Sequence, residues 1–328
     1  MSLRILTALA LFALFSLIVP SLRAEELNIY FKTTPRSELL RPFYDPADMA
    51  LLITGADGKP VERGTVDIRL DAPKPGRFFS TDFPLVEGTR LTEMRLRLRQ
   101  GRAVWKSLLP IRGEYQVAVD VLTNDGRKVS KTFTFKIRES GAKWLTLGGF
   151  SMGLFFLGFI AGSIFTGAKI TRVALLALVF LVVTTPIAKA QGDNRNQPAV
   201  LEIEPATVGR LSLVRWYLNN VAPSDKPNAL LTLTIKHLEK DKIAFAVERL
   251  PVAGEFSLKF HFPDGARYRV TANAQIAGGL SIQNEQIVEV IGVEPPARAM
   301  VPALALFVAI VALGLGVGRW SKRRSSAV

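Results

Sequence analysis

The stretch LPIRGEYQVAVDVLTNDGRKVSKTFTFKI, residues 109–137, decides the fold class of this chain. Its residues alternate between apolar and polar types on both sides of Asn124, Asp125 and Gly126. A turn of this composition between alternating runs predicts a β-hairpin. Short alternating strands separated by turns, as in this stretch and others along the chain, predict an antiparallel β-sandwich.

The same patterning extends to other parts of the chain. Residues 94–110 alternate Met and Leu with Arg, and residues 230–251 contain two alternating runs around Lys240, Asp241 and Lys242. Residues 255–276 form two more runs around Asp264 and Gly265, which predicts another hairpin. About seven short strands in roughly 100 residues is the size of an immunoglobulin-like domain. We therefore predict a mainly β protein with two antiparallel immunoglobulin-like β-sandwich domains in tandem, each followed by a membrane helix.

An internal repeat supports the prediction of two related domains. Residues 109–115 read LPIRGEY and residues 250–256 read LPVAGEF, an offset of 141 positions. In both halves an alternating run, an Asp-Gly turn and another alternating run follow. Each half also contains a signal-like segment, a β-rich region and an apolar segment in the same order. The pattern indicates a tandem duplication or fusion of two exported proteins with single anchors.

Apolar segments divide the chain into its predicted units. The first begins with Arg4 and ends in small residues before Glu25, as in a secretory signal peptide cut after Ala24; an uncleaved anchor is the alternative. The predicted units are a signal peptide at 1–24, a periplasmic β-sandwich at 25–143, a transmembrane helix at 144–168, a signal-like or transmembrane helix at 169–190, a second periplasmic β-sandwich at 191–298, a transmembrane helix at 299–318 and a basic cytoplasmic tail at 319–328.

The segment KITRVALLALVFLVVTTPIAKAQ, residues 169–191, resembles a signal peptide in the middle of the chain. Its apolar part is short for a spanning helix and long for a signal peptide. We interpret it as the former signal of a second unit, now an outward-going helix. Cleavage after Ala190 stays open.

The net charge of +14 is mostly a sign of membrane topology. Nine basic residues beside the apolar segments contribute nine of these charges: Arg4, Arg23, Lys169, Arg172, Lys189, Arg319, Lys322, Arg323 and Arg324. Basic residues beside spanning helices set orientation. This distribution predicts a multi-pass protein of a bacterial inner membrane with both β-domains in the periplasm, and it argues against nucleic acid as a partner.

A family resemblance accompanies this patterning. The segment GKPV (58–61) before a strand and the segment GEY (113–115) at the start of an alternating strand resemble small periplasmic immunoglobulin-like modules of the YtkA-like and FixH-like kinds, and distantly CopC-like copper-resistance proteins. The resemblance covers mainly residues 50–138. Copper-binding members of such groups use histidine and methionine clusters, which this sequence lacks, so the resemblance implies a fold and no metal site.

The residues that could carry chemistry are few. The chain has no cysteine and only two histidines. His237 shares parity with Leu233 and Ile235 and is predicted to face the core, whereas His261 shares parity with Lys259 and is predicted to face solvent. A metal site is therefore not expected, although these histidines are its only candidates. No nucleophile elbow, phosphate loop or dinucleotide fingerprint is present, and we expect neither a cofactor nor enzymatic activity.

Some residues are candidates for interaction. Glu114 and Glu255 each follow a glycine and are interpreted as residues at strand starts; a hydrolase would need them. The loop at residues 80–91 combines aromatic residues with arginine, as protein-binding patches do. The alternative is a loop that its phenylalanines pin to the sandwich. The interaction candidates are Phe79, Phe83, Arg90, Arg215, Trp216 and Tyr217. Small residues allow close helix packing, and the candidates for it are Gly158, Gly162, Gly314 and Gly318.

The functional expectation follows from the architecture. We predict a non-enzymatic accessory, assembly or scaffold subunit of a membrane complex, with the lipid bilayer and an integral membrane protein as partners. The alternative is a periplasmic metal- or solute-binding module that accompanies a transporter.

Overall fold

A computed structural model describes residues 27–76, 79–139, 141–164, 198–219, 228–276 and 279–325. The predicted signal peptide, the segment 169–190 and both predicted cleavage sites lie outside these residues. The elements are β1 (Asn28–Thr34), a 3-10 turn η1 (Ser37–Leu39), β2 (Pro46–Thr54), β3 (Gly64–Asp71), β4 (Arg90–Arg97), β5 (Arg102–Leu108), β6 (Gly113–Thr123), β7 (Lys128–Ile137), α2 (Gly141–Ile164), β8 (Ala199–Ile203), β9 (Leu211–Leu218), β10 (Asn228–His237), β11 (Lys242–Ala253), β12 (Glu255–His261), β13 (Arg267–Ile276), β14 (Ser281–Glu289) and α3 (Ala297–Ser325).

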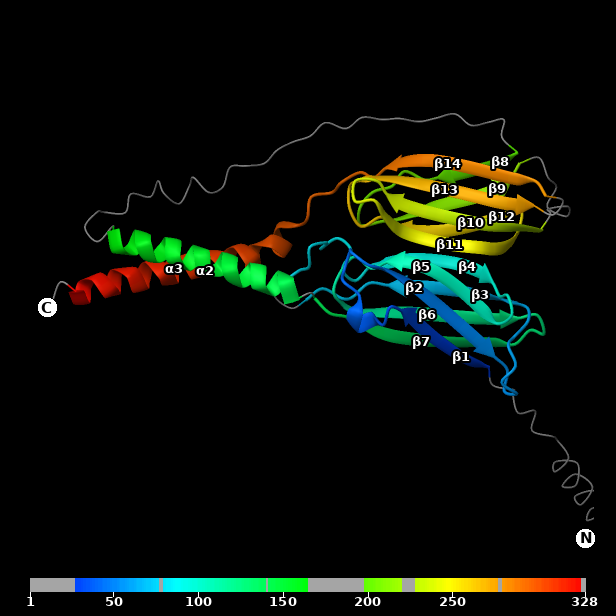
Figure 1. Cartoon of the computed structure of the whole chain (residues 1–328), viewed down its shortest axis with the longest axis horizontal. Coiled ribbons are helices and arrows are strands. Elements are labelled where there is room, and N and C mark those ends of the chain that lie inside the picture. Colours follow the sequence, from blue (N-terminus) through cyan, green and yellow to red (C-terminus); the bar gives the residue numbers. More distant parts are fainter. Residues whose placement is uncertain are drawn as a thin grey trace, which may run out of the picture.

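The strands form two antiparallel sheets of seven strands, and each sheet runs through both halves of the chain (Figure 1). Sheet A has the order β1-β2-β5-β11-β10-β13-β14, and sheet B has the order β7-β6-β3-β4-β12-β9-β8. The first half is joined to the second through β5–β11 in sheet A and β4–β12 in sheet B. The mainly β, antiparallel prediction is confirmed. The halves share sheets, however, and do not stand as separate sandwiches.

The two halves are related by a pseudo-two-fold symmetry. Each strand of the first half has its counterpart seven labels later, so β1 corresponds to β8 and β7 to β14. Exchanging counterparts converts the order of sheet A into that of sheet B, read from its other end. The register at the junction obeys the same relation. Ser107 pairs with Phe245 in sheet A, and their counterparts, Phe260 (107 + 153) and Thr92 (245 − 153), pair with each other in sheet B. The junction is therefore built like the interface of a symmetric dimer, in which each surface meets its own counterpart.

This symmetry corrects the predicted repeat. Residues 113–114 begin β6, whereas the matching residues 254–255 lie at the start of β12, which is the counterpart of β5. From β4–β7 to β11–β14 the structural offset is 153, and the predicted offset of 141 is wrong. The predicted hairpin at 255–276 is wrong for the same reason, because β12 belongs to sheet B and β13 to sheet A. The hairpins at 109–137 and 230–251 are confirmed.

Two buried tyrosines mark the true repeat. The Tyr115 hydroxyl donates to the Ile111 carbonyl at 2.6 Å, and the Tyr268 hydroxyl donates to an Asp264 carboxylate oxygen at 2.5 Å. In both halves the ring begins a core strand and its hydroxyl binds four residues upstream, as in a tyrosine corner. Burial raises the pKa of both phenols far above the usual value, so both remain hydrogen-bond donors.

The outer ends of the two halves also correspond. Lys131 donates from Nζ to the Ile29 carbonyl at 3.0 Å, and its counterpart Asn284 donates from Nδ2 to the Ala199 carbonyl at 3.0 Å. Asn284 also accepts a hydrogen bond from the Trp216 indole at 3.2 Å. Each bond links an edge strand of one sheet to an edge strand of the other, which closes that end of the molecule.

The helices α2 and α3 leave the same end of the β structure and run side by side in the same direction (Figure 1). Both are long and apolar enough to cross a membrane. A helix of 24 residues is about 36 Å long at 1.5 Å per residue, against a hydrocarbon core of about 30 Å. Compared with the predicted bounds, α2 begins three residues earlier, and α3 extends past residue 318 into the basic residues.

Glycines form the contact between the helices. A Cβ added to Gly158 would lie 2.4 Å from the Val311 carbonyl oxygen, and one added to Gly314 would lie 2.3 Å from the Phe155 carbonyl oxygen. Gly162 and Gly318 make the equivalent contacts one turn further along. The helix pair thus repeats the two-fold relation of the strands, and the glycine faces are used within the chain.

Candidate functional site

The clearest departure from the two-fold symmetry is the connection between β3 and β4, residues 72–89. Its counterpart between β10 and β11 is the tight turn 238–241. Connections longer than about 12–15 residues without secondary structure are uncommon in compact domains, and functional loops are one of their main classes. Because the scaffold itself needs only a short turn at this place, the long connection is the first candidate for a functional element.

The connection builds a groove of about 1040 Å³ at the helix end of the first half. The other walls are the end of β7, the start of β6 and the first turn of α2. The side chains that give the groove its character are basic and aromatic: Lys74, Phe79, Arg112, Lys136, Arg138 and Trp144.

Polar contacts fix α2 against the groove. The Arg112 guanidinium donates to Glu139 at 3.0 Å and lies 5.7 Å from the centre of the Trp144 ring. Lys143, in the first turn of α2, forms an ion pair with Asp82 of the long connection. These contacts hold the base of the helix pair and the first half in one arrangement, so the groove keeps its shape where the helix begins.

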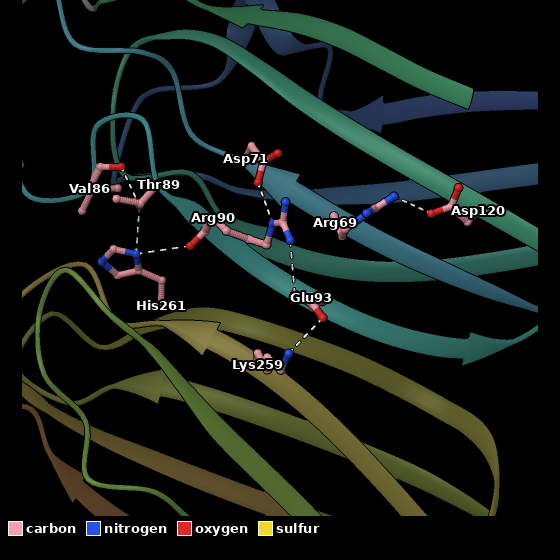
Figure 2. A network of polar contacts seen from close by, with 9 residues as sticks. All are labelled: Arg69, Asp71, Val86, Thr89, Arg90, Glu93, Asp120, Lys259 and His261. Atoms are coloured by element: carbon pink, nitrogen blue, oxygen red, sulfur yellow. Dashed lines mark hydrogen bonds and ion pairs between the residues drawn. The ribbon is translucent and has the colours of Figure 1, made fainter. Parts of the chain in front are cut away.

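An ion-pair network covers sheet B at the junction of the halves (Figure 2). Arg90 donates to Asp71 at 2.9 Å and to Glu93 at 3.3 Å, and Lys259 from the second half donates to Glu93 at 3.0 Å. The hydrogen bond from Lys259 is the main reason why the pKa of Glu93 is lowered. The network therefore ties β12 to β4 on the outer face.

His261 is buried at this junction, so the prediction that it faces solvent is wrong. Its Nε2 accepts from the Gly209 N–H at 3.0 Å. Its Nδ1 lies 3.0 Å from the Thr89 hydroxyl, which itself donates to the Val86 carbonyl, and 3.3 Å from the Arg90 carbonyl (Figure 2). Since these neighbours require an acceptor at Nε2 and a donor at Nδ1, the ring is neutral.

We expect the stability of the protein to fall as the pH drops below about 6.5. Burial lowers the pKa of folded His261, so the unfolded state binds the proton more readily, and stability is lost as the pH falls through the unfolded pKa toward the folded one. The slope can approach about 1.4 kcal/mol per pH unit. Thermal unfolding of the full chain between pH 7.5 and 5 measures it.

The matched variants are His261→Gln and His237→Gln. The first removes the titrating junction ring and should flatten the dependence on pH between 5 and 7, whereas the second should keep it. If the stability of His261→Gln depends on pH as steeply as that of the wild-type protein, the assignment of this pH dependence to His261 is contradicted.

A second contact locks the halves on the side of sheet A. Phe43 adopts a left-handed backbone conformation, with φ 61°, that few non-glycine residues take. Its ring lies 3.7 Å from Lys240 Nζ and packs edge-on against the buried His237.

Asp264 lies beside this contact. Burial favours a raised pKa for Asp264, but hydrogen bonds from Tyr268, His237 and Lys240 outweigh burial and lower it. Both histidines are thus held by hydrogen bonds within the fold, His237 at the contact on the side of sheet A and His261 at the contact on the side of sheet B.

The outer faces of the two halves differ at equivalent positions. In sheet A, Tyr30 lies opposite Leu52, and both are exposed beside the exposed Val104. We call Tyr30, Leu52 and Val104 the apolar patch. The counterparts in sheet B, found through the strand pairing, are Val200, Tyr217 and Ser257. There the Arg215 guanidinium lies 5.5 Å from the centre of the Tyr217 ring and donates a hydrogen bond to Glu255 at 2.7 Å. The second half thus has one polar residue and two partly covered ones where the first half exposes three apolar side chains.

The structure disperses the predicted interaction residues. Phe79 is exposed at the groove, Phe83 packs 4.8 Å from Phe43 near the junction, and Arg90 lies in the ion-pair network. Trp216 is fully buried, which corrects its assignment to a surface patch. Alternation in β9 points it into the core, while its neighbours Arg215 and Tyr217 face outward.

The acidic candidates lie apart. Glu114 is an exposed residue of β6 at the groove, and Glu255, at the start of β12, forms an ion pair with Arg215 of β9. Among the residues that the structure describes, no group of three or more His, Cys, Asp or Glu side chains is placed to hold a metal ion. Sequence reasoning missed Asn284, Lys131 and the groove. The long run of residues between β3 and β4 was the available signal for the groove.

The comparisons with known proteins give no family. No family model and no curated protein matches the chain, so the resemblance to the YtkA-like, FixH-like and CopC-like groups stays a prediction. Among solved structures, a tetra-tandem repeat from the extending region of a large adhesion protein is 10% identical, with a TM-score of 0.24, and the match covers 81% of this chain and 50% of that one.

Two other solved structures show the same level of likeness. A two-domain fibronectin type III segment of chicken tenascin is 9% identical, with a TM-score of 0.20 and coverage of 81% of this chain and 98% of that one. A membrane-anchored protein of Corynebacterium diphtheriae is 10% identical, with a TM-score of 0.23 and coverage of 82% and 55%. Similarity at this level carries no argument about function.

Proposed function

We propose that the chain is a non-enzymatic, multi-pass protein of a bacterial inner membrane that presents both halves of its β structure to the periplasm. It acts there as an accessory, assembly or scaffold subunit and binds an integral membrane protein. The parallel helix pair supports the topology, because both helices leave the β structure in one direction. Arg319, Lys322 and Arg323 at the far end of α3 fit the cytoplasmic side.

The parallel arrangement has a topological requirement. α2 ends away from the β structure, and the chain re-enters that structure at β8. If α2 and α3 span the membrane, the chain must cross it a third time between them, which agrees with the predicted outward-going helix at 169–190.

The apolar patch carries the proposal of a protein partner. At the equivalent places of sheet B, Val200 and Tyr217 are only partly exposed, Ser257 is polar, and the Arg215–Glu255 ion pair lies beside Tyr217, whereas sheet A exposes Tyr30, Leu52 and Val104. Exposed apolar residues that cluster over neighbouring strands are typical of protein interfaces. We assign the patch as the partner-binding face. The metal- or solute-binding alternative has no comparable observation in its favour within the described chain.

Site-specific photo-crosslinking in cells tests this function. A photoreactive residue at Val104 should give one discrete adduct with a membrane protein, whereas the same residue at Ser257, the symmetry-related position, should give at least about fivefold less. Both positions are exposed on the outer face of a central strand, so the scaffold is matched. The absence of an adduct from Val104, or equal adducts from both positions, would contradict a partner-binding face.

A further inference from the structure

The groove lies where the first half meets the start of α2. Trp144 is 57% exposed in the first turn of the helix and lines the groove, and Phe79, 45% exposed, faces the same space. Tryptophan at the end of a spanning helix belongs to the interface between water and hydrocarbon. If α2 crosses a membrane, the groove is at the depth of the lipid headgroups.

The charge of the groove favours an anion. Its lining has five basic residues and three acidic ones, a difference of +2. Asp71 is paired with Arg90 and Glu139 with Arg112, and the third acid, Glu114, lies opposite Lys136 in the β6–β7 ladder. Among the described residues, the side chains of Lys74, Lys136 and Arg138 form no ion pair or hydrogen bond. Three basic side chains are thus available to a ligand.

The second half does not repeat this charge. The residues equivalent to Arg112, Lys136 and Arg138, at the offset of 153, are Gly265, Glu289 and Ile291. A Cβ added to Gly265 would lie 2.6 Å from the Gly292 backbone, so the backbone itself fills this place. Because the second half folds in the same way without these basic residues, the basic groove of the first half is not required for folding.

We propose that this groove binds the phosphate headgroup of an anionic phospholipid, with the acyl chains beside the helix pair. Lys74, Lys136 and Arg138 would hold the phosphate oxygens, since lysine and arginine are the usual phosphate ligands in proteins. Trp144 and Phe79 would pack against the glycerol and the first part of the acyl chains. The inference rests on the membrane anchoring in the proposed function and is independent of the partner-binding face.

The test uses the full chain in nanodiscs made with equal amounts of phosphatidylglycerol and phosphatidylcholine. Native mass spectrometry identifies the lipids that stay bound when the protein is released. We expect at least about fivefold more phosphatidylglycerol than phosphatidylcholine on the wild-type protein. Each basic residue near an anionic lipid surface strengthens binding by roughly fivefold. The triple variant Lys74→Gln, Lys136→Gln, Arg138→Gln should reduce this preference to less than about twofold.

The matched control changes three basic residues away from the groove, in Lys32→Gln, Arg97→Gln, Lys128→Gln, and should keep the preference. Equal loss in both triple variants would show a general charge effect and would overturn the site. Addition of inorganic phosphate distinguishes the source of the anion: full displacement of the lipid at millimolar phosphate would mean a free-phosphate site.

Failure of this inference can be separated from failure of the proposed function. A chain that inserts into nanodiscs but shows no headgroup preference overturns the lipid site alone. A chain that stays outside the nanodiscs overturns the membrane anchoring and the lipid site together.

Discussion

Leu258→Asp should unfold both halves of the protein at the same denaturant concentration and reduce the free energy of unfolding by at least about 4 kcal/mol. Leu258 is fully buried in β12 and pairs with Met94 of the first half and Val214 of the second. An aspartate there removes core packing and buries a carboxylate without a partner. Because both sheets are continuous through the junction, the damage cannot be confined to one half.

Hydrogen exchange of the full chain at increasing denaturant measures the coupling. Protection in β3 of the first half and in β10 of the second should be lost together, in the wild-type protein and in the variant. Leu122→Asp is the matched control, because Leu122 is 49% exposed and surface changes usually cost no more than about 0.5 kcal/mol. Loss of protection in β10 while β3 stays protected would show that the halves are independent.

Gly158→Leu should separate the two helices. Its Cβ would overlap the Val311 carbonyl oxygen, and that oxygen is backbone and cannot rotate away as a side chain would. Gly314→Leu should have the same effect through the Phe155 carbonyl. The chain has no cysteine, so a Phe150→Cys, Phe307→Cys pair gives a clean reading with a short thiol crosslinker; the two native rings lie 5.3 Å apart. We expect crosslinking to fall at least about tenfold, which corresponds to about 1.4 kcal/mol.

Two glycines in the same helices serve as controls. A Cβ at Gly153 in α2 or at Gly316 in α3 would meet nothing within 4 Å. Gly153→Leu and Gly316→Leu should therefore retain the crosslink. Its loss in these variants as well would mean that any added bulk disturbs the helices and that the glycine contact has no special role.

Local patterns in the sequence were sufficient for the strands. Alternation around Asn124, Asp125 and Gly126 predicted the β6–β7 hairpin, and the charged turn near Lys240 predicted β10–β11. The same kind of pattern failed at Asp264, because a turn between alternating runs can join two strands of one sheet or pass from one sheet to the other. Pairing depends on which neighbour offers a free edge, and that is a property of the whole fold.

Long-range features could not be predicted in this way. His261 has the parity of an exposed residue, but loop residues from the first half and Gly209 cover it. The repeat was detected in the wrong register because LPIRGEY and LPVAGEF match in letters, whereas the structural match rests on Tyr115 and Tyr268 with changed neighbours. The groove was only hinted at by the aromatic residues at 78–83, since its basic residues come from several separate places: the long connection, β4, the loop before β6 and the end of β7.

The junction through β4–β12 and β5–β11 has a consequence for stoichiometry. Two identical chains assembled on this axis would display every surface feature twice and would recruit ligands in pairs. A single polypeptide allows the two halves to differ, and here the patch and the groove each lie on one half. Under the proposed function, an assembly organised by this chain would therefore be directional, with one partner and one headgroup for each molecule at any dilution.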